Sequence, residues 1–154
     1  MADSLTIPIF EPENYFAQRL DAYGVFVDRF GSIQRQFEVV VEGRKTDTGF
    51  SLDEYFLYDD GEREERRWDV TALGNGRYEG RCRDVIGVAR GVCTANMLSW
   101  KYRFRLEMFG RKVAVTFDDV MVLQAGGVLV NRASLSKAGL KLGEVLLTLS
   151  LIHI

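Results

Sequence analysis

Hydrophobic and polar residues alternate along much of the chain, and this alternation is typical of β-strands that bury one face. In the clearest segment, Trp100, Tyr102 and Phe104 fall on one face. Lys101 and Arg103 lie between them on the opposite face. Residues typical of turns, mainly glycine, asparagine and aspartate, interrupt such segments about every ten to twelve residues. The pattern therefore predicts an all-β fold.

About ten segments carry the strand pattern. They are expected at residues 18–30, 33–45, 50–58, 63–72, 77–85, 88–94, 97–108, 111–124, 128–136 and 140–149. The links between them are short, and Asp60-Gly61 suits a type I′ hairpin turn. Short links make neighbouring strands antiparallel, because a parallel crossover needs a dozen or more residues. An open meander of this size would expose long edges, so we expect a closed up-and-down barrel.

The chain has 154 residues, which is the size of a single domain. The segment Glu13–Arg19 is the only one that favours a short helix, and we expect it to act as a lid or plug. We divide the chain into an N-terminal extension at residues 1–17, a barrel domain at residues 18–148 and a tail at residues 149–154.

Composition and charge narrow the classes of partner. The formal net charge of −2 gives no electrostatic reason to expect a nucleic acid or an anionic membrane as partner. No apolar run approaches the length of a transmembrane helix. The N-terminus lacks the basic and apolar regions of a secretory signal, so a cytoplasmic location is expected from the sequence as written.

Several charged residues fall on the face that the period of two assigns to the barrel interior. They are Asp28, Arg35, Glu54, Arg66 and Asp119, which we take as candidate ligand-binding residues. Isolated charges in an apolar interior are prohibitive, so these residues must pair, bind a charged ligand or lie at a solvated mouth. Three alternatives remain open: a structural ion-pair cluster or rim, the polar floor of a ligand cavity, or a register error caused by a bulge.

Small residues occupy the inward face of the sixth expected strand, at Gly87, Ala89, Gly91 and Cys93. The space that they leave can hold a ligand or a bulky neighbour such as Trp68 or Trp100. A hairpin turn near Gly87-Val88 would also make Cys82 and Cys93 cross-strand neighbours. We expect both thiols to be reduced, because no export signal accompanies them.

The sequence carries no recognisable catalytic or metal-binding motif. It contains one histidine and two cysteines, too few for structural zinc, and we expect neither metal nor cofactor. Adjacent residues of a strand point to opposite faces, so Asp118-Asp119 does not form a catalytic pair of carboxylates. Asp59-Asp60 most simply builds a turn. We assign no catalytic residue and do not predict an enzyme. A base at Asp119 or Glu54 would require a strongly raised carboxyl pKa beside an open pocket.

A series of short segments extends over most of the chain. It consists of Tyr58-Asp59-Asp60-Gly61-Glu62, Arg66, Trp68, Tyr78-Glu79-Gly80, Asp84-Val85-Ile86-Gly87, Trp100-Lys101-Tyr102, Phe117-Asp118-Asp119, Asn131-Arg132, Ser136-Lys137 and Gly139. From about Phe10 to Thr148, this series resembles the bacterial family known as domain of unknown function 3833. The resemblance implies a lipocalin-like β-barrel and no established activity, ligand or catalytic residue. Many members look like lipoproteins, so a periplasmic or membrane-anchored location is the alternative if the true start is missing.

The last six residues, Leu149 to Ile154, raise a separate question. In one reading frame, the recognition end of a widely used sequencing transposon encodes the same six residues in the same order. We therefore expect a tail derived from a sequencing adapter, and an ordinary final strand is the alternative. His153, the only histidine, is accordingly given no catalytic or metal role.

Two functions follow from these expectations. The first is a non-enzymatic barrel that binds a small apolar or amphipathic molecule such as a lipid, with Arg35 and Arg66 orienting an acidic head group. The second is a cell-envelope or cytoplasmic interaction module whose barrel is filled solid by side chains. The filling residues would be Phe26, Phe37, Phe56, Trp68, Trp100, Phe104 and Phe117. A cavity of about 300 Å³ or more distinguishes the first function from the second.

Overall fold

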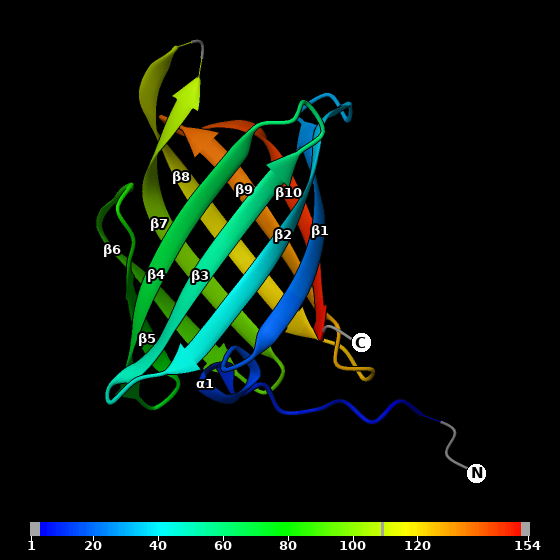
Figure 1. The fold of residues 1–154 in the computed structure, drawn as a ribbon, viewed down its shortest axis with the longest axis vertical. Coiled ribbons are helices and arrows are strands. Elements are labelled where there is room, and N and C mark those ends of the chain that lie inside the picture. Colours follow the sequence, from blue (N-terminus) through cyan, green and yellow to red (C-terminus); the bar gives the residue numbers. More distant parts are fainter. Residues whose placement is uncertain (1–3, 109, 152–154) are drawn as a thin grey trace.

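A computed structural model describes residues 4–108 and 110–151 of the protein. In this part of the chain, ten antiparallel strands form one closed barrel (Figure 1). The elements are α1 (Pro12–Tyr15), β1 (Arg19–Asp28), β2 (Ile33–Lys45), β3 (Gly49–Tyr58), β4 (Arg63–Gly74), β5 (Arg77–Arg81), β6 (Val85–Thr94), β7 (Met97–Met108), β8 (Arg111–Leu123), β9 (Leu129–Lys137) and β10 (Leu140–Leu151). Each strand pairs with its neighbour in sequence, and β1 closes the barrel on β10. The predicted all-β, up-and-down closed barrel is confirmed.

The turn between β5 and β6 lies earlier in the chain than expected. β5 ends at Arg81, and the amide of Val85 donates a hydrogen bond of 3.0 Å to the carbonyl of Cys82. The turn expected near Gly87-Val88 is therefore wrong. Gly87 instead lies in an irregular stretch of β6, with a φ of 73° that favours glycine.

This earlier turn changes the position of the two cysteines. Cys93 pairs in register with Leu98 of β7, whereas Cys82 lies in the turn after β5. The predicted cross-strand neighbourhood of Cys82 and Cys93 is therefore wrong, and both thiols are free.

Trp100 fills the space that the small residues of β6 leave. A Cβ atom at Gly91 would lie 2.4 Å from Trp100 Cε3, and one at Gly80 would lie 2.5 Å from Trp100 Cζ2. The indole therefore requires glycine at both positions, because any larger residue would overlap it. At Gly91, the space is therefore filled by a bulky neighbour and not by a ligand, which was the other alternative.

The short helix α1 covers one end of the barrel (Figure 1). Phe10 and Phe16, on either side of the helix, are buried, and the ring of Phe16 stacks on that of Phe50 at a centroid distance of 5.5 Å. The hydroxyl of Tyr78 donates a hydrogen bond of 2.6 Å to Glu13 Oε1. The helix is shorter than the expected segment Glu13–Arg19, because β1 begins at Arg19.

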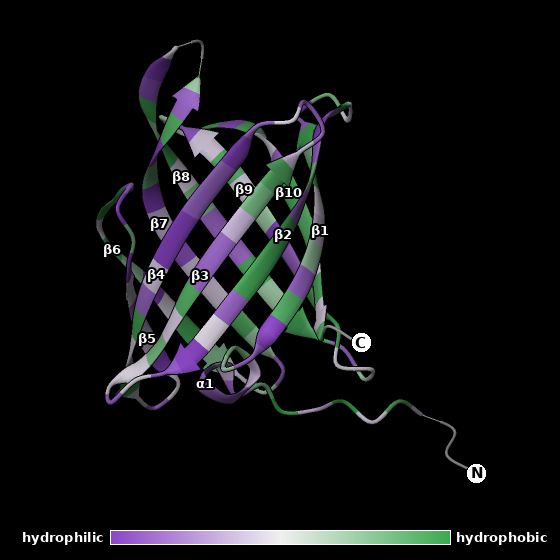
Figure 2. Ribbon diagram, in the orientation of Figure 1, coloured by the Kyte–Doolittle hydropathy of each residue, from purple (hydrophilic) through white to green (hydrophobic). Residues whose placement is uncertain are grey.

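No helix of the described residues covers the opposite end of the barrel, which we call the open end, and strands β7 and β8 extend beyond it (Figure 1). The wall is also incomplete beside β4. The five-residue β5 pairs only with the part of β4 from Asp69 to Gly74, so residues 63–68 pair with β3 alone. This free edge is mostly hydrophilic (Figure 2). Its outward Arg63, Glu65 and Arg67 are exposed, which protects an edge from pairing with another chain.

Strand β10 continues past the expected end of the barrel domain. Leu149 is buried and pairs with Ala22, and Leu151 pairs with Leu20. Any alternating apolar segment can extend a strand in this way, so the foreign origin of residues 149–154 stays a prediction. His153 lies outside the described residues. Along the described chain, no helix has the length and apolar character needed to span a membrane.

Candidate functional site

The barrel encloses a cavity of about 350 Å³. Its lining extends from Phe16, beside α1, to Arg35 and Tyr58 at the open end. Aromatic and aliphatic side chains make up most of this lining, and they come from the inward faces of β1 to β4 and β7 to β10. The barrel is therefore hollow, and the alternative of a barrel filled solid by side chains is wrong.

Aromatic rings form the middle of the cavity wall. Trp68 packs edge-on against Trp100 at 5.9 Å and against Tyr102 at 5.2 Å, measured between ring centroids. Tyr102 in turn stacks on Phe117 at 5.0 Å. These contacts hold flat apolar faces in fixed positions, which suits a largely preformed binding site.

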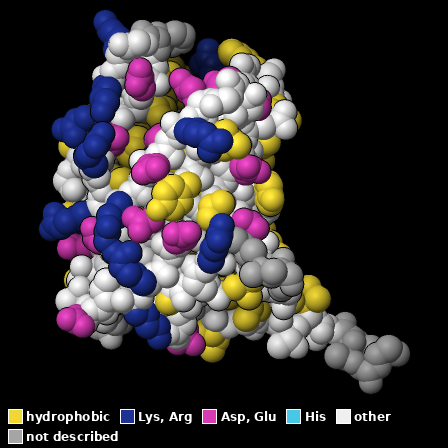
Figure 3. Space-filling model, viewed as in Figure 1, with side chains coloured by type: hydrophobic (Ala, Val, Ile, Leu, Met, Phe, Trp, Pro, Cys, Tyr) yellow, Lys and Arg dark blue, Asp and Glu magenta, His cyan; other side chains and the backbone are white. Residues whose placement is uncertain are grey.

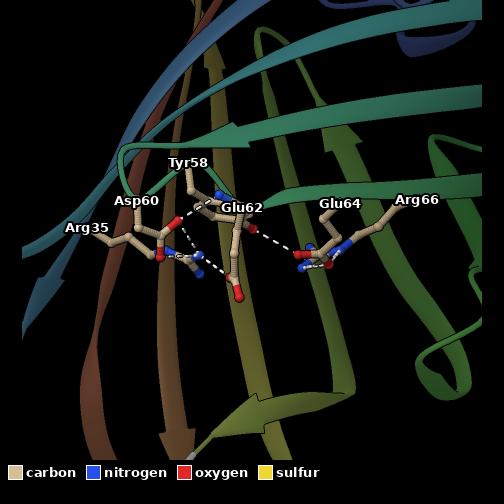
Figure 4. Close-up of polar contacts among 6 residues, drawn as sticks. All are labelled: Arg35, Tyr58, Asp60, Glu62, Glu64 and Arg66. Carbon is tan, nitrogen blue, oxygen red and sulfur yellow. Dashed lines mark hydrogen bonds and ion pairs between the residues drawn. The ribbon is translucent and has the colours of Figure 1, made fainter.

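Arg35 lies at the open end of the cavity, where its guanidinium is already engaged (Figure 4). Nη2 forms ion pairs with Asp60, at 3.1 Å to Oδ2, and with Glu62. The guanidinium carbon also lies 3.5 Å from the centre of the Tyr58 ring, in cation–π geometry. Charged side chains of both signs also cover the outer face of β3 and β4 nearby (Figure 3).

Arg66 is also engaged, deeper in the barrel. Its Nε donates a hydrogen bond of 2.7 Å to Glu64 Oε1, and the hydroxyl of Tyr58 donates one of 2.9 Å to Glu64 Oε2 (Figure 4). The guanidinium lies over the rings of Phe56 and Phe104, at 4.8 and 4.6 Å. Both arginines therefore have carboxylate partners within the protein. An acidic head group would therefore compete with these partners for the two guanidinium groups.

Glu54 pairs in register with Arg66 across β3 and β4. Burial raises the pKa of its carboxyl to about 7, although Arg66 and Trp68 favour the charged form. Glu54 and Arg66 also border a second, more polar pocket of about 290 Å³ between the free edge of β4 and the turn at residues 82–84. These two side chains thus lie between the main cavity and the gap in the wall.

Asp119 lies in the cavity wall toward the α1 end of the barrel, with an exposed fraction of 4%. Asn131 of the adjacent strand is 7% exposed and also lines the cavity. Asn131 Nδ2 donates a hydrogen bond of 3.2 Å to Asp119 Oδ2. Burial raises the pKa of Asp119 to about 7, while the hydrogen bond from Asn131 opposes this shift.

Four of the five predicted residues line the cavity: Arg35, Glu54, Arg66 and Asp119. Their binding role stays a prediction. The inward position predicted for Asp28 is wrong. Its carboxylate accepts hydrogen bonds from the amides of Phe30 and Ser32 and from Gln34, so it stabilises the β1–β2 turn. The cause is the position of Asp28 as the last residue of β1, directly before this turn. The nearby register shift inserts Gln34 in β2 and leaves the alternation along β1 intact.

Glu64 and Asn131 were not predicted as site residues. Both follow the period of two, because Glu64 stands two residues before Arg66, and Asn131 alternates with the buried Leu129 and Ala133. Their parity alone could have placed them inside the barrel. In residues 4–108 and 110–151, no three His, Cys, Asp or Glu side chains gather as ligands for a metal ion.

Comparison with known proteins identifies one family. The family model described as "Protein of unknown function (DUF3833)" matches residues 3–151, which is nearly the whole chain. The chain matches none of the curated proteins.

Proposed function

The chain belongs to the DUF3833 family of unknown function, and from its barrel interior we propose that it is a non-enzymatic protein that binds a small apolar or amphipathic molecule. The observation that carries this proposal is the cavity of about 350 Å³ with its mainly apolar lining. Ligand sites are typically clefts or cavities of about 300–1,000 Å³ with a few polar groups among apolar ones.

The aromatic wall supplies the affinity in this proposal. Burial of apolar surface contributes about 25 cal/mol per Å², before the cost of association is subtracted. Trp68, Trp100 and Phe117 hold their ring faces in place through contacts with one another or with Tyr102, so little order is lost on binding. The ligand enters at the open end, beside Arg35 and Tyr58.

An uncharged fluorescent probe, N-phenyl-1-naphthylamine, tests this proposal. Its emission should rise saturably with the wild-type protein, because the probe leaves water for an apolar cavity. Leu147→Trp places a larger side chain in the cavity, so it should weaken probe binding at least about tenfold. Leu146→Trp is the matched control, because Leu146 is 41% exposed on the outside of the same strand, and it should bind the probe like the wild type.

Two results would overturn the proposal. One is no saturable emission with the wild type at probe concentrations up to about 100 μM. The other is an equal loss of binding in the two tryptophan variants, provided that thermal melts find both folded. Either result would mean that the probe does not bind in the cavity.

A second candidate function is an enzyme that uses Asp119 or Glu54 as a general base. It is favoured by the pKa of about 7 at both carboxyls, because a general base works best with a pKa near the working pH. The test is to incubate a cell metabolite extract with the wild type and with Asp119→Asn and to analyse both by mass spectrometry. A compound that only the wild type consumes supports an enzyme, and an unchanged extract supports the non-enzymatic proposal.

A further inference from the structure

We propose that the deep end of the cavity binds a hydrogen-bond donor of the ligand, an amine or a hydroxyl group, between the side chains of Asp119 and Asn131. This inference rests on the proposed function and deepens it, because it gives the chemical class of the ligand. The ligand is then an amphiphile with a donor head group and an apolar body. The donor lies toward the α1 end of the barrel, and the body lies along the aromatic wall.

The two side chains come from neighbouring strands. Asp119 of β8 pairs in register with Ala133, and Asn131 of β9 pairs with Met121, so the two residues are diagonal neighbours on the inward face. They share one hydrogen bond, from Asn131 Nδ2 to Asp119 Oδ2. The oxygens Asp119 Oδ1 and Asn131 Oδ1 are buried and have no hydrogen-bond partner among the described residues.

When Asp119 is ionised, both unpartnered atoms are acceptors, and this chemistry selects the ligand group. A buried polar atom without a partner costs about 1–3 kcal/mol, and most buried polar atoms in proteins are satisfied. Although the two oxygens are buried, their side chains line the cavity, so a small rotation of each side chain would let a bound molecule supply the missing donors. A primary amine carries enough hydrogens to satisfy both oxygens. A hydroxyl group satisfies one of them.

The charges around the cavity favour the same class of ligand. Arg35 is ion-paired with Asp60 and Glu62, and Arg66 with Glu64. Glu54 and Asp119 face the cavity, and no ion pair in the described structure involves either of them. When these two carboxyls are ionised, no ion pair of the described residues compensates their charges. A carboxylate head group would be repelled there, whereas an amine or an alcohol would not.

The test is displacement of N-phenyl-1-naphthylamine from the wild type by four C12 amphiphiles, each below its critical micelle concentration or, for the uncharged compounds, below its solubility in water. Dodecylamine and 1-dodecanol carry a donor, 1-methoxydodecane carries none, and dodecanoate carries a negative charge. We expect each donor to displace the probe at a concentration at least about tenfold lower than 1-methoxydodecane or dodecanoate requires. The amine and the alcohol together show which donor the site prefers.

A double variant, Asp119→Leu with Asn131→Leu, locates the effect. It should keep probe binding and reduce the advantage of 1-dodecanol over 1-methoxydodecane to less than about twofold. The control is Asp118→Leu, because Asp118 is the exposed neighbour of Asp119 and its replacement should leave the wild-type advantage unchanged.

The two proposals fail in different ways. If the probe binds but the wild type does not distinguish 1-dodecanol from 1-methoxydodecane, the donor site is wrong and the ligand-binding barrel stands. The same conclusion follows if the double variant keeps the full advantage. If the probe does not bind the wild type at all, both proposals are wrong. If the double variant fails to fold, the comparison within the wild type still decides whether the cavity prefers a donor, and Asn131→Leu alone then tests the location.

Discussion

At the scale of single residues, Asp119 and Asn131 place polar groups where the core would be more stable without them. Replacing both members of a buried polar pair with apolar residues of similar size is often neutral or stabilising. We expect Asp119→Leu/Asn131→Leu to unfold at the same Tm as the wild type or a few degrees above it. Asn131→Leu alone should lower the Tm, because it removes the only hydrogen bond that the described residues donate to the buried carboxyl of Asp119. A double variant that melts more than about 5 °C below the wild type would assign the pair to the structure of the core.

The raised pKa of Asp119 gives the stability of the protein a particular pH dependence. Burial raises this pKa from 3.8 to about 7, and Asp118 and Glu54 add to the shift. The folded state thus binds the proton more tightly than the unfolded chain does. The resulting stability is complete below pH 3.8 and is lost as the pH rises through about 7. Between about pH 5 and 8, the free energy of unfolding should fall by on the order of 2 kcal/mol because of Asp119 alone.

Urea unfolding at several pH values measures this effect. Glu54, with its pKa also raised to about 7, contributes with the same sign. The decline between about pH 5 and 8 should therefore be smaller, though not absent, in the Asp119→Leu/Asn131→Leu variant. Glu144 does not interfere, because hydrogen bonds from Arg132 and Lys141 lower its pKa to about 2, below this range. A wild type whose stability rises from pH 5 to 8 would contradict the assignment.

The alternation of side chains along a strand predicted most of the inward charges correctly. The four residues that it placed inside lie within strands and line the cavity: Arg35, Glu54, Arg66 and Asp119. The alternation failed at Asp28, which is the last residue of β1 and whose carboxylate accepts hydrogen bonds from the amides of the following turn. No local pattern could show which charges are paired. The partners of Arg35 come from the β3–β4 turn, 25 and 27 residues further along the chain.

At the scale of elements, the N-terminal segment depends on a glycine in β2. A Cβ atom at Gly43 would lie 1.6 Å from the carbonyl oxygen of Phe16, so no other residue fits without moving the segment that carries α1. We expect Gly43→Ala to lower the Tm by about 5–8 °C, on the order of 2 kcal/mol.

The control for this prediction is Gly126→Ala. A Cβ atom at Gly126 would have open space around it, so the Tm of this variant should stay within about 2 °C of the wild type. If Gly43→Ala had the same Tm as the wild type, the carbonyl of Phe16 would not lie against Gly43 as described.

The strands themselves were largely predictable from sequence, since β2 and β7 begin and end where the alternation predicts. The exception is the region of β5 and β6. There the chain turns at residues 82–84, which lack the glycine or asparagine found in most of the other turns. The glycine at position 87 instead lies in an irregular part of β6. A glycine marks unusual backbone, and sequence alone does not say whether it is a turn or a bulge.

At the scale of the whole molecule, closure of the barrel followed from short links and the cost of open edges. The hollow interior did not follow from the sequence, because volume depends on how side chains from opposite walls meet. The aromatic residues that were candidates to fill the barrel, such as Trp68, Trp100 and Phe117, line its wall instead. They leave a space of about 350 Å³ between them.

The most direct test of a ligand inside the barrel uses the tryptophan fluorescence of the protein. The chain has two tryptophans, Trp68 and Trp100, and both line the cavity. A bromine atom quenches tryptophan emission on contact, so 11-bromo-1-undecanol in the cavity should quench most of the emission along a saturable curve. 1-Undecanol should compete with it and restore the signal. Quenching that rises linearly with concentration, as for free tryptophan, and that 1-undecanol does not reverse, would contradict a ligand site within the barrel.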